Sequence, residues 1–166
     1  MKINISTLSI KRPSISLEGD IDFSHHEFDP YHIKTIETCH VNAEMNFYSD
    51  DLYSLKLNIK GNAIVPCAYT LEDVSYPFNI KEELFYKQDI ADDDTSFYPL
   101  TSNEVDIDEA VLSLLISSIP FKVIKKGAKL PKSGNSYRFL SEDDYLKEKE
   151  NKSSPFDVLD DLDLNK

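Results

Sequence analysis

Apolar side chains alternate with polar ones along residues 37–86, and this period of two constrains the fold more than any other feature of the chain. Such alternation is typical of strands with one buried face, so the sequence predicts an antiparallel meander whose apolar face needs a cover. The alternating residues are Cys39, Val41, Ala43, Met45 and Phe47, then Tyr53, Leu55, Leu57 and Ile59, then Ala63, Val65 and Cys67, then Val74, Tyr76, Phe78 and Ile80.

Three breaks divide the alternating stretch. Ser49-Asp50-Asp51 is a turn signal, and Gly61-Asn62 indicates either a turn or a bulge. Pro77 has no N–H to donate to a strand ladder, so the last run is expected to be an edge or bulged strand.

The predicted cover is one strong helix over about residues 107–119. Asp106 can accept hydrogen bonds from the first turn, Glu109 stands three residues on as in a capping box, and Pro120 stops the helix after Ile119. Its apolar residues surround most of the circumference, so we expect burial on more than one side; a partner-binding helix is the alternative. The apolar residues are Ile107, Ala110, Val111, Leu112, Leu114, Leu115, Ile116 and Ile119.

These elements predict an α+β fold: an antiparallel β-sheet, twisted or partly closed, packed against one main helix. Residues 1–121 form the predicted core domain, and residues 122–166 form a loop-rich C-terminal extension carrying short helices. Ser141 followed by Asp144, and Ser154-Pro155 followed by Asp157, are helix start signals in this extension. Residues 87–104 are acidic and aperiodic, which predicts a loop.

Charge is unevenly distributed. With 18 Lys and Arg against 30 Asp and Glu, the formal net charge is −12, which excludes a uniformly basic nucleic-acid binder. Residues 121–140, however, hold six cations and no carboxylate: Lys122, Lys125, Lys126, Lys129, Lys132 and Arg138. We call residues 122–138 the basic segment.

The basic segment has two interpretations. Lysines at this density on Gly- and Pro-containing backbone suit phosphate groups, and Tyr137 beside Arg138 is able to stack on an unpaired base. The alternative is a solvated loop folded back onto the protein's own acidic surface.

No pattern predicts a catalytic, cofactor or metal site. Asp92-Asp93-Asp94 is contiguous and suits a solvated charge run better than acid–base catalysis. The histidines lack a metal-ligand rhythm and are expected on the surface or in turns: His25, His26, His32 and His40. An enzyme would require Cys67 or a carboxylate pair to meet a histidine in a cleft.

Cys39 and Cys67 form neither a Cys-x-x-Cys motif nor a disulfide framework, and reduced thiols fit the cytoplasm. We find no signal-peptide core and no apolar stretch long enough to span a membrane. The sequence therefore predicts a cytoplasmic, non-enzymatic protein with no cofactor and no membrane partner.

Residues 67–78, Cys-Ala-Tyr-Thr-Leu-Glu-Asp-Val-Ser-Tyr-Pro-Phe, resemble the signature segment of the YceD/YlbN family, with Cys67, Leu71, Pro77 and Phe78 as the matching positions. Three landmarks follow in the family's order: the 105–120 helix region, the stretch 133–144, and Ser154-Pro155-Phe156-Asp157 with a leucine pair. Tyr69 and Thr70 replace the Arg and second Cys of the broad pattern, so a metal-binding role suspected for cysteine-rich relatives does not transfer.

The resemblance implies a non-enzymatic ribosome biogenesis factor that supports 23S rRNA accumulation or processing and large-subunit assembly. The implied partner is pre-ribosomal large-subunit RNA or an assembly intermediate, contacted through the basic segment. The alternative is an acidic adaptor or holdase that binds a basic ribosomal protein without direct RNA contact, through Asp92 to Asp94 and the acidic C-terminus.

Overall fold

The computed structural model describes residues 1–49, 51–88 and 95–150. The chain divides into two compact units, Met1–Lys125 and Lys126–Lys166, and each is described by itself. The first unit holds the sheet and the main helix, and the second holds most of the basic segment and one short helix.

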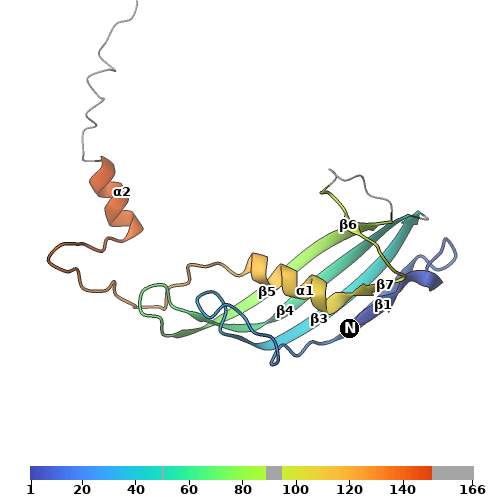
Figure 1. Ribbon diagram of the computed structural model, residues 1–166, viewed down its shortest axis with the longest axis horizontal. Helices are drawn as coiled ribbons and strands as arrows, with labels where there is room; N and C mark the ends of the chain where they lie inside the picture. Colours follow the sequence, from blue (N-terminus) through green and yellow to red (C-terminus); the bar gives the residue numbers. More distant parts are fainter. Residues whose placement is uncertain (50, 89–94, 151–166) are drawn as a thin grey trace, which may run out of the picture. The chain divides into compact units, whose positions relative to one another are not determined.

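A five-stranded sheet dominates the first unit, in the order β2 (Ser14–Asp20), β3 (Thr35–Ser49), β4 (Leu52–Pro66), β5 (Asp73–Lys87) and β6 (Tyr98–Pro99). Neighbours are antiparallel except β5 and β6, which pair in parallel. A two-stranded ribbon joins β1 (Lys2–Asn4) to β7 (Glu104–Asp106), and a short 3₁₀ helix, η1 (Ile5–Thr7), follows β1. The α+β class is confirmed, and the sheet is open (Figure 1).

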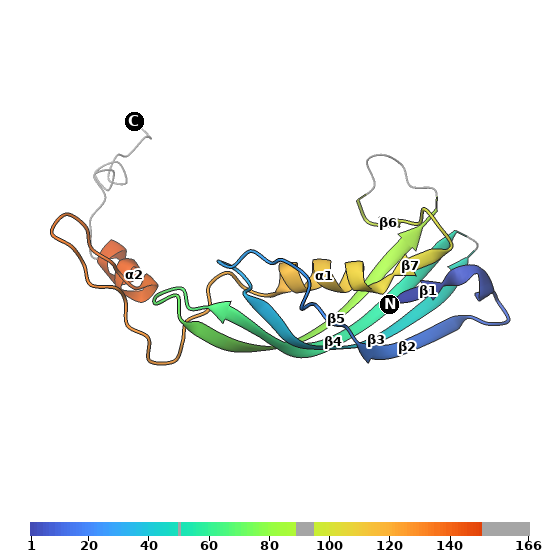
Figure 2. The ribbon, with the colours of Figure 1, turned by 60° about the horizontal axis from the view of Figure 1, so that its bottom comes forward.

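Helix α1 (Ile107–Ser118) lies on one face of the sheet together with the β1/β7 ribbon (Figures 1 and 2). The predicted alternation is confirmed, because the odd-numbered residues of β3 and β4 and the even-numbered residues of β5 supply the buried face. Val41, Ile59 and Ile80 stand opposite one another in this register. Burial of such aliphatic side chains contributes about 1.5–3 kcal/mol each.

The helix is buried on one side only, so the expectation of burial on several sides is wrong. Asp106 caps its N-terminus as predicted, with Oδ1 accepting from the Asp108 N–H at 3.0 Å. Leu112 and Leu114 are half-buried, and Ile116 is exposed. The buried stripe consists of Ile107, Ala110, Val111 and Leu115, and Ile119 just beyond the helix is also buried.

Strand β4 runs unbroken through Gly61-Asn62, so the turn interpretation of this pair is wrong. The irregularity lies in the neighbouring strand, where the register of β3 shifts between Ile36 and Thr38. A Cβ atom at Gly61 would stand 1.9 Å from the Thr38 carbonyl oxygen and 2.5 Å from the ring of Phe78. Glycine is needed here because the β3 backbone and the Phe78 ring occupy the space of a side chain.

The third alternating run is an edge strand near Pro77, as predicted. Strand β5 pairs with β4 along its whole length, whereas on its other side β6 pairs only with Tyr86 and Lys87. Strands β1, β2, β6 and β7 are not predicted by the sequence, and β6 lies within residues 87–104, which we expected to form a loop. The first and last have only three residues each, and the apolar side chains of β2, Ile15 and Leu17, are only half-buried.

The second unit is irregular up to residue 141 and continues as helix α2 (Glu142–Glu150). The predicted start signal is confirmed: the Asp144 N–H donates to Ser141 Oγ at 3.1 Å, and the Ser141 hydroxyl donates to the Asp144 carboxylate at 2.6 Å. The second start signal, at Ser154-Pro155, lies outside the described residues, as does the Asp92 to Asp94 run.

Gly61→Ala is predicted to destabilise the protein by about 1–3 kcal/mol, because the new methyl group overlaps backbone that cannot easily move. Gly19→Ala is the matched control, since a Cβ there meets only the flexible Met1 side chain at an ordinary 3.6 Å. Urea denaturation of both variants measures the difference. Equal unfolding free energies would show that Gly61 is not sterically required.

Candidate functional site

Three segments far apart in the sequence meet at the end of the first unit where α1 finishes: the turn 29–34, the loop 67–72 and the segment 119–125 (Figures 1 and 2). We call this region the signature end. Cys67 bridges Val123 in parallel, and the Ala68 N–H donates to the Val123 carbonyl at 2.8 Å. The family-like loop therefore anchors the first residues of the basic segment.

The loop 67–72 joins β4 to β5 and is closed tightly by its own backbone. The Cys67 N–H donates to the Glu72 carbonyl at 2.8 Å, and the Leu71 N–H donates to the Cys67 carbonyl at 2.9 Å. This closure places Leu71 at φ 60°, which costs a non-glycine residue about 1–2 kcal/mol. Leu71 is nevertheless 60% exposed, so core packing does not explain why leucine occupies this position.

Cys67 is a structural anchor within the signature end. Its Sγ accepts a hydrogen bond from the Lys125 N–H at 3.4 Å, and the side chain is fully buried. Hydrogen bonds from the Thr70 side chain and the Lys125 backbone lower the pKa of the thiol to about 7. A buried sulfur held in this way pins the chain after α1 to the hairpin loop and is shielded from reagents in solution.

Two ion pairs hold this loop and the start of β5. Lys34 Nζ pairs with the Asp73 carboxylate and donates to the Leu71 carbonyl at 3.3 Å. Lys125 Nζ contacts the Glu72 carboxylate at 2.9 Å, and this pairing lowers the pKa of Glu72 and raises that of Lys125. Lys125 is thus already turned toward the protein's own acidic surface.

His32 fixes the segment that follows α1. Its Nε2–H donates to the Ile119 carbonyl at 2.6 Å, and its ring stacks on Phe121 with centroids 3.8 Å apart. We expected His32 on the surface or in a turn; it lies in a turn but is buried. Because Ile119 is the C-cap residue of α1, His32 satisfies a carbonyl at the end of the helix.

The signature end presents apolar side chains to solvent although nearby residues are well anchored. Phe121 is 74% exposed despite its stacking on His32, and Leu71, Ile124 and Tyr31 are exposed as well. Exposed aromatic rings next to lysines are a combination that binds unpaired bases and phosphates.

The structure divides the predicted cations between the two units. Lys122 and Lys125 belong to the signature end, whereas Lys126, Lys129 and Lys132 are exposed on irregular backbone of the second unit. Within the described residues, these three lysines form no ion pair, unlike Lys125.

The other predicted site residues have diverse roles. Arg138 contacts the Glu148 carboxylate at 2.6 Å, while Tyr137 is 61% exposed and packs edge-on against Phe139. Pro77 and Phe78 lie within β5, where Phe78 covers Gly61, so these two signature positions serve the sheet.

Sequence reasoning missed three residues of the signature end: His32, Lys34 and Phe121. No local pattern marks them, because their partners Ile119, Asp73 and His32 are distant in the sequence. Among residues 1–49, 51–88 and 95–150, no cluster of three or more His, Cys, Asp or Glu is arranged to hold a metal ion. The same residues contain no helix of the length and apolar character that a membrane crossing requires.

The fold and the signature end define an α+β domain whose closed hairpin loop anchors a cation-rich segment. The chain belongs to the YceD family: the family model, described as large ribosomal RNA subunit accumulation protein YceD, matches residues 55–163. The predicted family is thereby confirmed, and membership connects the chain in broad terms with ribosomal RNA.

A curated relative is the uncharacterized protein YlbN of Bacillus subtilis (strain 168), which is 34% identical over 100 residues. The match covers 55% of this chain and 56% of the relative, so it spans little more than half of either protein. No solved structure matches the chain.

The lowered thiol pKa predicts a pH-dependent stability. The pKa of Cys67 is about 7 in the folded protein against 9.0 for a free thiol, so its thiolate stabilises the fold fully above pH 9. This contribution is lost as the pH falls through 7. We therefore expect the stability difference between the native protein and Cys67→Ser to grow from pH 6 to pH 9 in urea denaturation. Parallel stability curves for the two proteins would contradict this account of Cys67.

Proposed function

We propose that this protein is a non-enzymatic factor that supports accumulation of 23S rRNA during large-subunit assembly by contacting pre-ribosomal RNA through the basic segment. The observation that carries the proposal is the exposure of Lys126, Lys129 and Lys132 and their lack of ion pairs within the described residues. They lie on irregular backbone and directly follow the signature end in the chain. Family membership supports the choice of RNA.

The charges of the chain favour a local contact. In a plot of log affinity against log salt concentration, each lysine–phosphate contact adds about −0.7 to the slope for single-stranded nucleic acid. Three lysines therefore give modest, salt-sensitive binding, while the acidic remainder of the chain repels RNA. We expect the protein to approach RNA with the basic segment and to keep its acidic surfaces away.

Aromatic stacking supplies the second part of the contact. The exposed rings of Tyr137 and Phe121 suit unpaired bases, and stacking on such rings contributes about 1–3 kcal/mol per base. The ion pair between Arg138 and Glu148 is largely exposed and so stabilises little, which leaves the guanidinium available for exchange to a phosphate.

Reversal of the three lysines tests this function. Lys126→Glu/Lys129→Glu/Lys132→Glu is expected to abolish co-sedimentation with large-subunit precursors in sucrose gradients of cell extract. Lys11→Glu/Lys60→Glu/Lys81→Glu is the matched control, with the same change in net charge at exposed lysines of the first unit, and should co-sediment as the native protein does.

Two outcomes would overturn the proposal. Unchanged co-sedimentation of the first variant would remove the basic segment as the contact. Capture of a basic ribosomal protein that survives nuclease treatment, with no RNA retained, would favour an acidic adaptor instead. Circular dichroism of both variants establishes that loss of binding is not loss of folding.

A further inference from the structure

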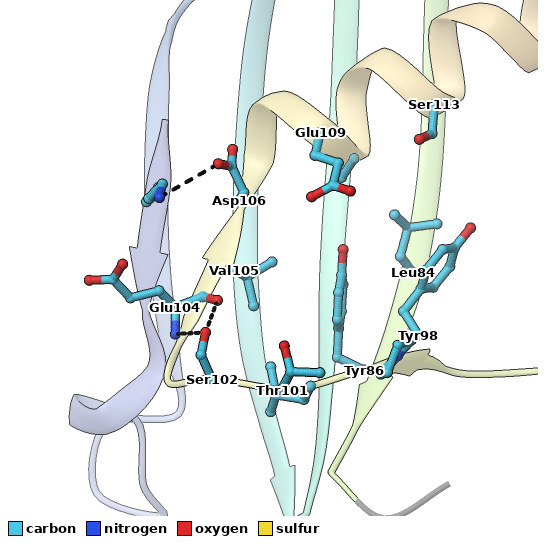
Figure 3. A pocket seen from close by; sticks show the side chains of 14 residues that line it. Leu84, Tyr86, Tyr98, Thr101, Ser102, Glu104, Val105, Asp106, Glu109 and Ser113 are labelled. Carbon is cyan, nitrogen blue, oxygen red and sulfur yellow. Dashed lines mark hydrogen bonds and ion pairs between the residues drawn. The ribbon is translucent and has the colours of Figure 1, made fainter. Parts of the chain in front are cut away.

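A cavity of about 450 Å³ lies at the opposite end of α1 from the signature end, between the first turns of the helix, the end of β5 and the segment that leads from β6 to β7 (Figure 3). Its size falls in the range of small-ligand pockets, about 300–1,000 Å³. Tyr86 and Tyr98 supply aromatic surface, Glu109 a carboxylate, and Thr101 and Ser113 hydroxyl groups.

The Tyr86 hydroxyl is a polar group without a partner in this cavity. The side chain is only 8% exposed, and its ring packs against Tyr98 with centroids 5.5 Å apart. Within the described residues its hydroxyl makes no hydrogen bond, and its oxygen is not among the buried polar atoms that lack a partner, so it is open to the cavity and available to a ligand. Burial, with Tyr98 and Glu109 adding to it, raises the pKa of this phenol to about 12, so it stays protonated at neutral pH.

Glu109 faces the same space. Figure 3 shows its carboxylate and the Tyr86 hydroxyl directed toward one another. Lys2, the cation that lines the cavity, pairs with the Asp106 carboxylate at 3.8 Å. Among the described residues Glu109 has no ion-pair partner, so the cavity contains a carboxylate whose charge is not neutralised.

We propose that this cavity binds the guanidinium group of an arginine presented by a basic polypeptide. A planar guanidinium donates to a carboxylate and stacks on a tyrosine ring, and its remaining N–H groups suit the Tyr86 oxygen. A carboxylate at this position repels anions and therefore disfavours a phosphate ligand. The formal charge of the whole chain, −12, attracts a basic polypeptide more strongly than a small amine of single charge.

The proposal is independent of RNA contact, because no lysine of the basic segment lines the cavity. Failure of one proposal therefore leaves the other standing. The matched control for Glu109 is Glu44, an exposed carboxylate on the face of β3 that points away from the buried core.

Fluorescence anisotropy with synthetic peptides tests the inference. The probe is a fluorescein-labelled Gly-Ser peptide with three arginines, and the comparison peptide carries citrulline, which has the same shape without the charge. We expect the arginine peptide to bind about tenfold more tightly than the citrulline peptide, and Glu109→Gln to weaken binding about tenfold, whereas Glu44→Gln changes it less than about twofold. Tyr86→Phe, which keeps the ring and removes the hydroxyl, should weaken binding by a smaller factor.

Three results would overturn the inference. Equal binding of both peptides would exclude a guanidinium site, and equal losses in Glu109→Gln and Glu44→Gln would exclude this cavity. Agmatine is a small amine with one guanidinium group. If it displaces the peptide when both supply the same concentration of guanidinium, the ligand is a small amine rather than a polypeptide. The lysine-reversed variant Lys126→Glu/Lys129→Glu/Lys132→Glu should retain peptide binding, which separates this site from the RNA contact.

Discussion

The burial of one sheet face by α1 is the constraint on which the rest of the structure depends. Strands β3, β4 and β5, with 15 residues each, expose a long apolar surface, and a 12-residue helix on that surface must be fixed at both ends. Asp106 caps the first end, and His32 binds the carbonyl at the second. Each end of the helix consequently gathers segments that are distant in the sequence, and both sites described above lie at these ends.

The proposed RNA contact rests on how the first unit anchors the start of the basic segment. Cys67 and His32 anchor residues 119–125 and so fix the position where the chain leaves the first unit. The basic segment begins within these anchored residues. Lys125 is partly neutralised by Glu72, so it serves the hairpin loop first. In the proposed function the exposed lysines beyond it contact phosphate, and in the further proposal the Glu109 cavity binds a cation.

Local patterns predict the three long strands β3, β4 and β5, the main helix and its cap, because alternation and capping depend on neighbours in the sequence. Local patterns do not predict features that depend on a residue distant in the sequence. Gly61 is explained by Thr38 and Phe78 from adjacent strands, and the burial of His32 depends on a carbonyl 87 residues away. The positive φ of Leu71 follows from closure of its loop, and the sequence does not signal it because the position is not a glycine. The cavity lined by Tyr86 and Glu109 likewise exists only after the chain has folded.

The central claim, that the basic segment meets large-subunit RNA, is tested most directly by ultraviolet crosslinking in cells. The crosslinked RNA is sequenced, and the crosslinked peptides are mapped by mass spectrometry. The account predicts 23S precursor sequences attached to peptides from residues 121–138, with Phe121 and Tyr137 among the crosslinked positions. Crosslinks that carry no 23S sequence, or that map only to the outer face of the sheet, would contradict it.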